Sequence, residues 1–367
     1  MSKPKVIAFY LPQYHPVKEN NEWFGEGFTE WTNVAKAKPL FKGHDQPRVP
    51  RDLGFYDLRL PEVREKQAEL AKEAGIDAFC YYHYWFGNGK VILEMPLKEV
   101  IRLKEPDFPF CICWANHSWY KKNWNPDIKR IEQNLLLEQT YPGDDDIIQH
   151  FNYLLTAFKD DRYLKVEGRL LFVIYNIKEI PNFSHFKELW NKLANMNGLP
   201  EFYFLSYTTR IKDVYNDEMK LSDGIILALH SNIQYHPNSL FGKYWNYIKY
   251  IFSEITHKPA LVYKYKDAIN YFISPTYRQE NVIPVIIPNW DYSPRRGAGG
   301  LILKNATPDL FAKHACMIFN TIKHKKESKQ IVFLKSWNEW GEGNYMEPDL
   351  TYGKGYIYAL RNEIDKL

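Results

Sequence analysis

Short apolar runs of strand length, rich in β-branched and aromatic residues, alternate along the chain with stretches whose apolar residues recur at helical spacing. Eight such runs are recognisable, at Val6–Tyr10, Asp77–Tyr82, Phe110–Trp114, Leu170–Tyr175, Glu201–Ser206, Gly224–Leu227, Ile283–Ile287 and Ile331–Leu334. Amphipathic helices are expected between most of them, with clear patterns at Pro61–Ala74, Ile147–Phe158, Phe186–Met196, Tyr244–Glu254 and Leu310–Ile322. Alternating strands and helices predict a parallel sheet, and eight repeats favour a closed (β/α)8 TIM-type barrel over an open doubly wound sheet.

This α/β barrel is expected to form one domain over residues 1–367, with long βα loops over its C-terminal face. The link between the fifth and sixth runs is short and its helical pattern is weak, so the strand count is least secure there. Active sites of such barrels lie at the C-terminal ends of the strands. The residues just after each run are therefore the first place to look for chemistry.

Aromatic, amide and imidazole side chains gather after most of the runs. A lone histidine such as His83 is more often structural than functional, and Tyr81 or Tyr84 is expected to point into the barrel wall. Core packing alone would not concentrate such side chains at one end of so many strands. We therefore predict substrate-binding residues at Tyr14, His15, Tyr82, His83, Trp85, Trp114, Asn116, His117, Asn176, Asn289, Trp290 and Asp291.

The eighth run ends in a segment that holds two carboxylates, Glu339 and Glu342, among indoles and glycines. Desolvation by neighbouring aromatic rings and the charge of a second carboxylate can separate the pKa values of two acids. One acid is then protonated while the other is ionised, as general acid/base cleavage or transfer of a glycosidic bond requires. The alternative is a helix N-terminus, where acids are favoured by the helix dipole. We predict Glu339 and Glu342 as catalytic residues, flanked by the substrate-binding residues Trp337, Asn338 and Trp340.

Two loops differ from ordinary connections. The first, residues 12–60, is far longer than usual and is a candidate lid. It carries Glu30 and Trp31, predicted to bind substrate. Glu30 is expected to contact sugar hydroxyls or to support the carboxylate pair, and the alternative is a salt bridge to Arg48 or Arg51 that holds the loop in place.

The second loop carries Arg295 and Arg296 before a glycine-rich turn that follows the seventh run. Paired arginines beside backbone N–H groups suit a phosphate or diphosphate, and a salt-bridged surface turn is the alternative. The sequence has no P-loop lysine motif and no G-x-G-x-x-G after the first run, which disfavours a nucleoside triphosphate or a dinucleotide.

Composition narrows the function further. The formal net charge is +4, from 48 basic and 44 acidic residues that are interspersed, so nucleic acid is not an expected partner. Aromatic residues make up 16% of the chain, which suits stacking on sugar rings. Metal-binding spacings are absent from the sequence, and no metal or cofactor is expected. No apolar run suggests membrane insertion or a signal peptide, and the four cysteines fall mostly in apolar runs, so a cytoplasmic location is expected.

Five segments form longer and more specific motifs: Gly27–Val34, Pro39–Pro47, Asp52–Arg59, Trp337–Gly343 and Glu347–Asp349. They resemble the WbsX-like proteins, bacterial proteins of surface-polysaccharide gene sets that are often called glycosyltransferases. Their domain is similar to glycoside hydrolase family 99. The resemblance runs from the first predicted strand to the last helix and implies a role in making or trimming O-antigen, capsule or a related lipopolysaccharide.

The related hydrolases are retaining endo-α-mannosidases for which neighbouring-group attack by the substrate's 2-hydroxyl is proposed. The resemblance implies Glu339 as the base that takes the 2-hydroxyl proton and Glu342 as the acid, later base, at the leaving oxygen. Gly341 is smaller than the residue expected in the mannosidases, so we expect it to open the pocket. Three hypotheses stay open: a glycosidase or transglycosidase acting on an oligosaccharide or polysaccharide, a glycosyltransferase using a nucleotide-linked or lipid-linked sugar, and a non-catalytic sugar-binding barrel.

Overall fold

The computed structural model describes residues 3–125, 130–235, 248–249, 251–253, 255–256 and 258–367. Its centre is a barrel of eight parallel strands, each paired with the next until β2 pairs with β1 and closes the ring. Around the ring the strands are β1 (Lys5–Tyr10), β14 (Ile331–Leu334), β12 (Val282–Ile286), β10 (Gly224–Leu227), β9 (Phe202–Thr208), β8 (Arg169–Ile174), β4 (Phe110–Trp114) and β2 (Ala78–Trp85). The predicted (β/α)8 barrel is confirmed, and all eight runs supply one barrel strand each.

The helices that follow the strands agree with the apolar spacing. The clearest are α3 (Pro61–Ala74), which begins with proline and ends at the left-handed Gly75, α5 (Asp144–Phe158), α6 (Phe183–Met196) and α11 (Pro308–Ile322). Between β9 and β10 the only α-helix of the described chain is the four-residue α7 (Asp217–Lys220). Most of the helix predicted at 244–254 lies outside the described residues.

Alternate residues of the barrel strands face the interior and the surrounding helices. Phe9 packs inside the barrel against Tyr82 and Phe333, at ring-centroid distances of 5.4 and 5.0 Å. Its neighbour Tyr10 points outward and donates a hydrogen bond to Gln67 of α3. This alternation decides which of the residues at the strand ends can reach a site inside the barrel mouth.

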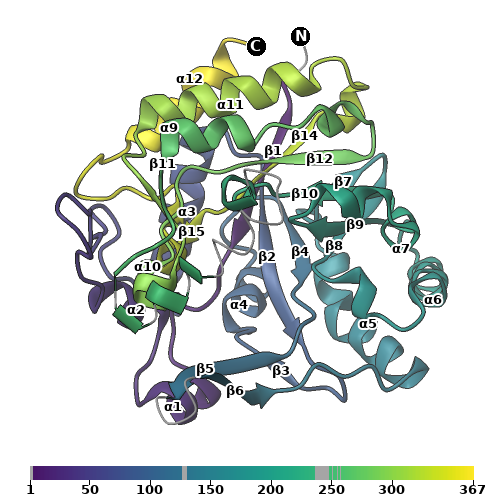
Figure 1. Ribbon diagram of the computed structural model, residues 1–367. Helices are drawn as coiled ribbons and strands as arrows, with labels where there is room; N and C mark the ends of the chain where they lie inside the picture. The colour runs from purple at the N-terminus through teal and green to yellow at the C-terminus, as the bar shows by residue number, and fades with distance from the viewer. Residues whose placement is uncertain (1–2, 126–129, 236–247, 250, 254, 257) are drawn as a thin grey trace.

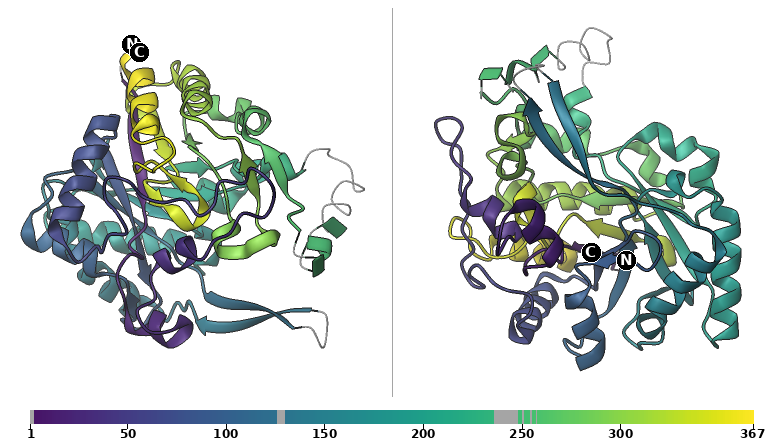
Figure 2. Two further views of the ribbon diagram at one scale, coloured as in Figure 1. Left: turned by 90° about the vertical axis from the view of Figure 1, so that its left-hand side faces the viewer. Right: turned by 90° about the horizontal axis from the view of Figure 1, so that it is seen from below.

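Long connections cover the C-terminal end of the barrel, opposite the two chain termini (Figure 1). The first carries α1 (Lys18–Phe24) and α2 (Glu30–Ala35), the loop after β4 carries the hairpin β5 (Trp119–Asn125) and β6 (Arg130–Leu137), and the loop after β12 carries α10 (Ser293–Arg296). The hairpin extends away from the barrel body (Figure 2).

Shorter elements complete the described chain. They are β3 (Val91–Ile92), α4 (Met95–Leu103), β7 (Lys165–Val166), β11 (Val262–Lys264), α9 (Tyr265–Ala268), β13 (Ile302–Lys304), β15 (Asn338–Glu339), β16 (Asn344–Tyr345) and α12 (Gly355–Asp365). Among the described helices, none combines the length and the apolar character needed to cross a membrane.

Candidate active site

The carboxylate segment after β14 folds into a tight hairpin. Strands β15 and β16 pair in antiparallel fashion, with Asn338 opposite Tyr345, and a 3-10 turn over Trp340–Glu342 connects them. Gly343 ends the turn with φ 64°, and a Cβ there would lie 2.8 Å from the backbone nitrogen of Asp291. The hairpin is therefore closely packed against the loop after β12, and it presents Glu339 and Glu342 to that loop.

Arg295 of α10 joins three carboxylates from two loops. Its Nη1 donates to Glu342 Oε1 at 2.5 Å and to Glu339 Oε1 at 3.3 Å, while Nε and Nη2 donate to the two oxygens of Glu30 at 2.9 and 3.1 Å. The guanidinium side chain is 19% exposed and the Glu30 carboxylate 3%. Glu30 therefore pairs with Arg295, and its predicted alternative partners, Arg48 and Arg51, lie beside Asp45 and Asp52 instead.

A second cation approaches the pair from the end of β14. The ammonium of Lys335 lies 3.4 Å from Glu339 Oε2 and 3.9 Å from Glu342 Oε2, and Ser336 Oγ donates to Glu339 Oε2 at 3.0 Å. Asn344 Nδ2 donates to Glu342 Oε2 at 3.3 Å. Glu339 thus accepts from three donors, two of which are cations, whereas the second oxygen of Glu342 has only Asn344 as a hydrogen-bond donor and Lys335 at the longer distance of 3.9 Å.

These surroundings separate the two acids. Burial alone would raise the pKa of Glu339, but Lys335 and Arg295 outweigh burial and lower that pKa to about 2. Burial, followed by the charge of Glu339, raises the pKa of Glu342 to about 7 despite the two cations. At neutral pH the pair holds one ionised carboxylate and one acid that is half protonated, which is the division of roles that acid/base catalysis needs.

Gly341 has a different role from the one expected from the sequence. A Cβ at this position would lie 2.0 Å from Glu30 Oε1 and 3.0 Å from Arg295 Nε. The glycine does not open the pocket, because the Glu30 carboxylate fills the space that a side chain would take. Its absent side chain instead allows Glu30 and Arg295 to reach the carboxylate pair.

Several predicted site residues fix the position of the hairpin that carries Glu339 and Glu342. Asn338 accepts from the backbone nitrogen of Leu11 and donates to its carbonyl oxygen, which ties the motif to the end of β1. The Tyr14 hydroxyl donates to the Asn338 carbonyl and accepts from the Trp340 backbone nitrogen. Trp31 packs against Tyr14 and Trp340 and donates to the Tyr56 carbonyl. These side chains position the motif and the first loop.

The buried Glu347 completes that support. It accepts hydrogen bonds from Trp340 Nε1 at 2.6 Å, Gln67 Nε2 at 2.6 Å and the Tyr56 hydroxyl at 3.0 Å. Burial raises its pKa to about 7, against the effect of these donors. Trp337, completely buried, packs on Phe79 of β2.

Four residues at the ends of β2 and β4 point away from the barrel interior or support the backbone. His83 and Trp85 pack around His150 of α5, with a nitrogen-to-nitrogen distance of 3.0 Å between the two histidines, and Trp114 donates to the Trp85 carbonyl. Asn116 bonds the backbone nitrogen and carbonyl oxygen of Asn176. Strand alternation places these side chains in the wall.

The loop after β12 contributes anchors as well. Asp291 accepts from Gln46 and pairs with His44, both at 2.8 Å, and so fastens the first loop to the barrel. Asn289 caps the backbone nitrogen of Trp290, whose ring stacks on His230 at 3.9 Å. The buried His15 has no hydrogen-bond partner for either ring nitrogen within the described part of the chain.

Some side chains at the site were missed by sequence reasoning. Lys335 is the first residue after β14, at the end of the strand where active-site residues of this fold lie, and the sequence prediction does not include it. Tyr84 was expected in the wall, but it contacts Trp119 inside the mouth, and after burial the charge of Glu339 raises its pKa. Tyr82 was selected, and its hydroxyl lies 3.5 Å from Lys335.

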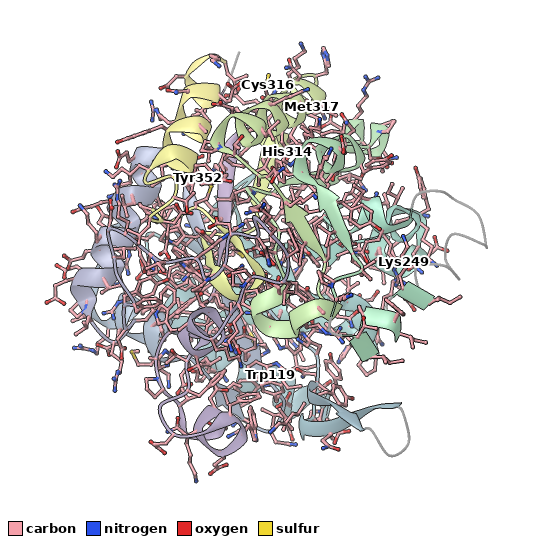
Figure 3. The ribbon with its side chains drawn as sticks, turned by 60° about the vertical axis from the view of Figure 1, so that its left-hand side comes forward. Trp119, Lys249, His314, Cys316, Met317 and Tyr352 are labelled. Atoms are coloured by element: carbon pink, nitrogen blue, oxygen red, sulfur yellow. The ribbon has the colours of Figure 1, made fainter. Side chains whose placement is uncertain are left out.

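A cavity of about 930 Å3 opens beside the cluster. Arg295, which contacts both carboxylates, and its partner Glu30 form the inner wall. The rest of the first loop and the hairpin build the outer wall, with Trp119 at the hairpin's base (Figure 3). Its volume is at the upper end of the range for sites that bind small molecules, so it can hold a short oligosaccharide. The lining also includes His117, Tyr292 and Arg296. Within the described residues, no group of three or more His, Cys, Asp or Glu side chains could hold a metal ion.

Comparisons with known proteins agree with this architecture. The model of the family described as glycosyltransferase WbsX matches residues 6–360. The chain is 31% identical over 373 residues to uncharacterized protein WxcX of Xanthomonas campestris pv. campestris strain B100, covering 98% of this chain and 50% of that protein. It therefore spans about half the length of the curated relatives it matches.

Two solved structures show the same fold. A GH99 endo-alpha-mannosidase from Bacteroides thetaiotaomicron superposes with a TM-score of 0.56 at 14% identity, over 100% of this chain and 97% of that one. A glycoside hydrolase-like protein superposes with a TM-score of 0.62 at 15% identity, over 99% and 94% of the two chains. At such identities the likeness concerns the fold.

Proposed function

Because the chain belongs to the WbsX glycosyltransferase family, we propose that it acts on glycosidic bonds of a bacterial surface polysaccharide and that Glu339 and Glu342 are its acid/base pair. The observation that carries this proposal is the geometry of two buried carboxylates that share one guanidinium beside a large cavity. The same surroundings shift the pKa values of the two acids in opposite directions. A purely sugar-binding barrel would gain nothing from burying these acids, since buried charges cost stability unless they are compensated.

The reaction would follow the neighbouring-group route. Glu339 takes the proton of the 2-hydroxyl as that oxygen attacks the anomeric carbon, and Glu342 gives its proton to the leaving oxygen as the glycosidic bond breaks. A water or an acceptor hydroxyl then loses its proton to Glu342 and attacks the anomeric carbon, and the released 2-oxygen regains its proton from Glu339. Two inversions at one carbon retain its configuration.

The cations set a condition on this route. Glu339, with a pKa of about 2, is a weak base. Arg295 donates a hydrogen bond to Glu342 Oε1, which leaves that oxygen less accessible to the substrate. Substrate entry must therefore draw the guanidinium partly away from the pair. Glu30, which holds the other edge of Arg295 at two points, is placed to keep the cation when it withdraws.

The second candidate is transfer from a phosphate-activated donor. Arg296 lines the cavity and favours it, but three carboxylates surround Arg295 and would repel a diphosphate there. We expect calorimetry to detect binding of α-linked oligosaccharides and no binding of nucleoside-diphosphate sugars. Tight nucleotide-sugar binding that is lost in Arg296→Gln and kept in Lys192→Gln, an exposed control on α6, would favour the transferase instead.

The pH dependence of kcat/KM tests the assignment of Glu342 as the acid. Since the acid must carry its proton, activity should fall as pH rises through about 7. Glu347 has a similar pKa, so the profile is measured for Glu347→Gln as well as for wild type between pH 5 and 9. A decline that persists in Glu347→Gln supports Glu342, and one that disappears there assigns the titration to Glu347.

A further inference from the structure

The outer part of the cavity has an excess of positive charge. Lys36 of the first loop and Lys121 of the hairpin line it. The charge of Arg295, on the inner wall, is by contrast offset by Glu30, Glu339 and Glu342. Within the described part of the chain, neither Lys36 nor Lys121 has a carboxylate within ion-pair distance. An anion from outside would therefore find cations that the protein itself does not neutralise.

The position of Lys121 is fixed by the contact between the β5–β6 hairpin and α1. Its ammonium donates to the Trp23 carbonyl at 3.1 Å and lies 5.9 Å from the centre of the Phe24 ring. Trp119 of the same strand packs on Trp23 at 5.9 Å. These contacts hold Lys121 in place against α1. Lys36 is the residue directly after α2.

Aromatic rings line the same cavity as these lysines. Trp23, Phe28, Trp119 and Tyr120 line the cavity from the first loop and from the hairpin, and such faces stack on the C–H faces of sugar rings. The cavity has room for more than one sugar. A chain bound with one unit at Arg295 can therefore contact aromatic faces and these lysines within one cavity.

We propose that this outer region is a subsite for an acidic saccharide, in which Lys36 and Lys121 bind a carboxylate or phosphate group carried by a sugar unit beyond the bond that reacts. The inference rests on the proposed function and adds the class of substrate: a negatively charged polysaccharide. Both anions share the chemistry that ammonium groups recognise, which is a compact negative charge with several hydrogen-bond acceptors.

Two matched pairs of probes test the subsite by equilibrium binding to the full chain. Hexagalacturonate is compared with its carboxyl-reduced form, and maltohexaose carrying one 6-phosphate with plain maltohexaose. We expect the acidic member of at least one pair to bind about tenfold more tightly at low salt, with the difference shrinking as ionic strength rises. The pair that shows the difference identifies the anion.

The lysines are tested with Lys36→Gln/Lys121→Gln, and Lys192→Gln on α6 serves as the control. The double variant should bind acidic and neutral probes equally, while the control keeps the wild-type preference. Equal binding of both members of each pair to wild type, binding of neither, or a preference that survives in the double variant overturns the proposal. Because these measurements need no turnover, a failure of the acid/base assignment would leave this result standing.

Discussion

Glu342→Gln is expected to lower kcat by about 10²- to 10⁴-fold on a natural glycosidic bond, since a positioned general acid contributes about that much. The amide keeps the shape of the side chain but cannot give a proton to the leaving oxygen. The loss should be far smaller for an aryl glycoside of the same sugar, because a good leaving group departs without protonation. Steady-state kinetics on both substrates measure the difference.

Glu339→Gln provides the contrast. Its proposed role is to activate the 2-hydroxyl, so its loss should be severe for both leaving groups. Glu188→Gln, an exposed acid on α6, controls for the substitution itself and should leave both rates unchanged. If Glu342→Gln lost the same factor on both substrates, the assignment of the acid would be wrong.

The barrel could be predicted because its strands are buried on both sides and therefore read as continuous apolar runs. The boundaries were less accurate where aromatic residues continue a strand beyond its aliphatic part: β2 runs to Trp85, three residues past the predicted Tyr82. Both α5 and α6 begin three residues earlier than predicted, at Asp144 and Phe183. The first turn of α5 consists of aspartates, which carry no apolar periodicity.

The site was only partly predictable, for a geometric reason. Sequence position shows that a residue lies at the end of a strand. The direction of its side chain is set by alternation along the strand, and an error of one residue in the register reverses it. His83 and Trp85 therefore lie in the wall, while Tyr82 and Tyr84 face the mouth. The contact between Glu30 and Arg295 joins residues 265 positions apart and has no local signal at all.

Arg295→Met should destabilise the protein strongly at pH 8, because it leaves Glu30, Glu339 and Glu342 buried without their shared cation. Breaking one partner out of a buried ion cluster costs about 3–5 kcal/mol. Lys335 still faces Glu339 and Glu342 in this variant, so Glu30 is expected to suffer most. Chemical denaturation gives the free energy of unfolding, and Arg296→Met on the same helix is the matched control.

The pH dependence of the stability lost in Arg295→Met distinguishes the contribution of the Arg295 charge from that of its packing. In wild type the pKa of Glu339 is lowered to about 2, so its contribution to stability is present above the ordinary carboxylate pKa and disappears as pH falls through that range toward 2. In Arg295→Met the buried carboxylates lose a cation and their pKa values rise, so the folded state binds protons more readily than the unfolded chain. The variant should therefore regain stability between pH 8 and pH 5, and Glu30→Gln/Arg295→Met should recover part of it at pH 8. A loss that is equal at both pH values would mean that Arg295 contributes through packing alone.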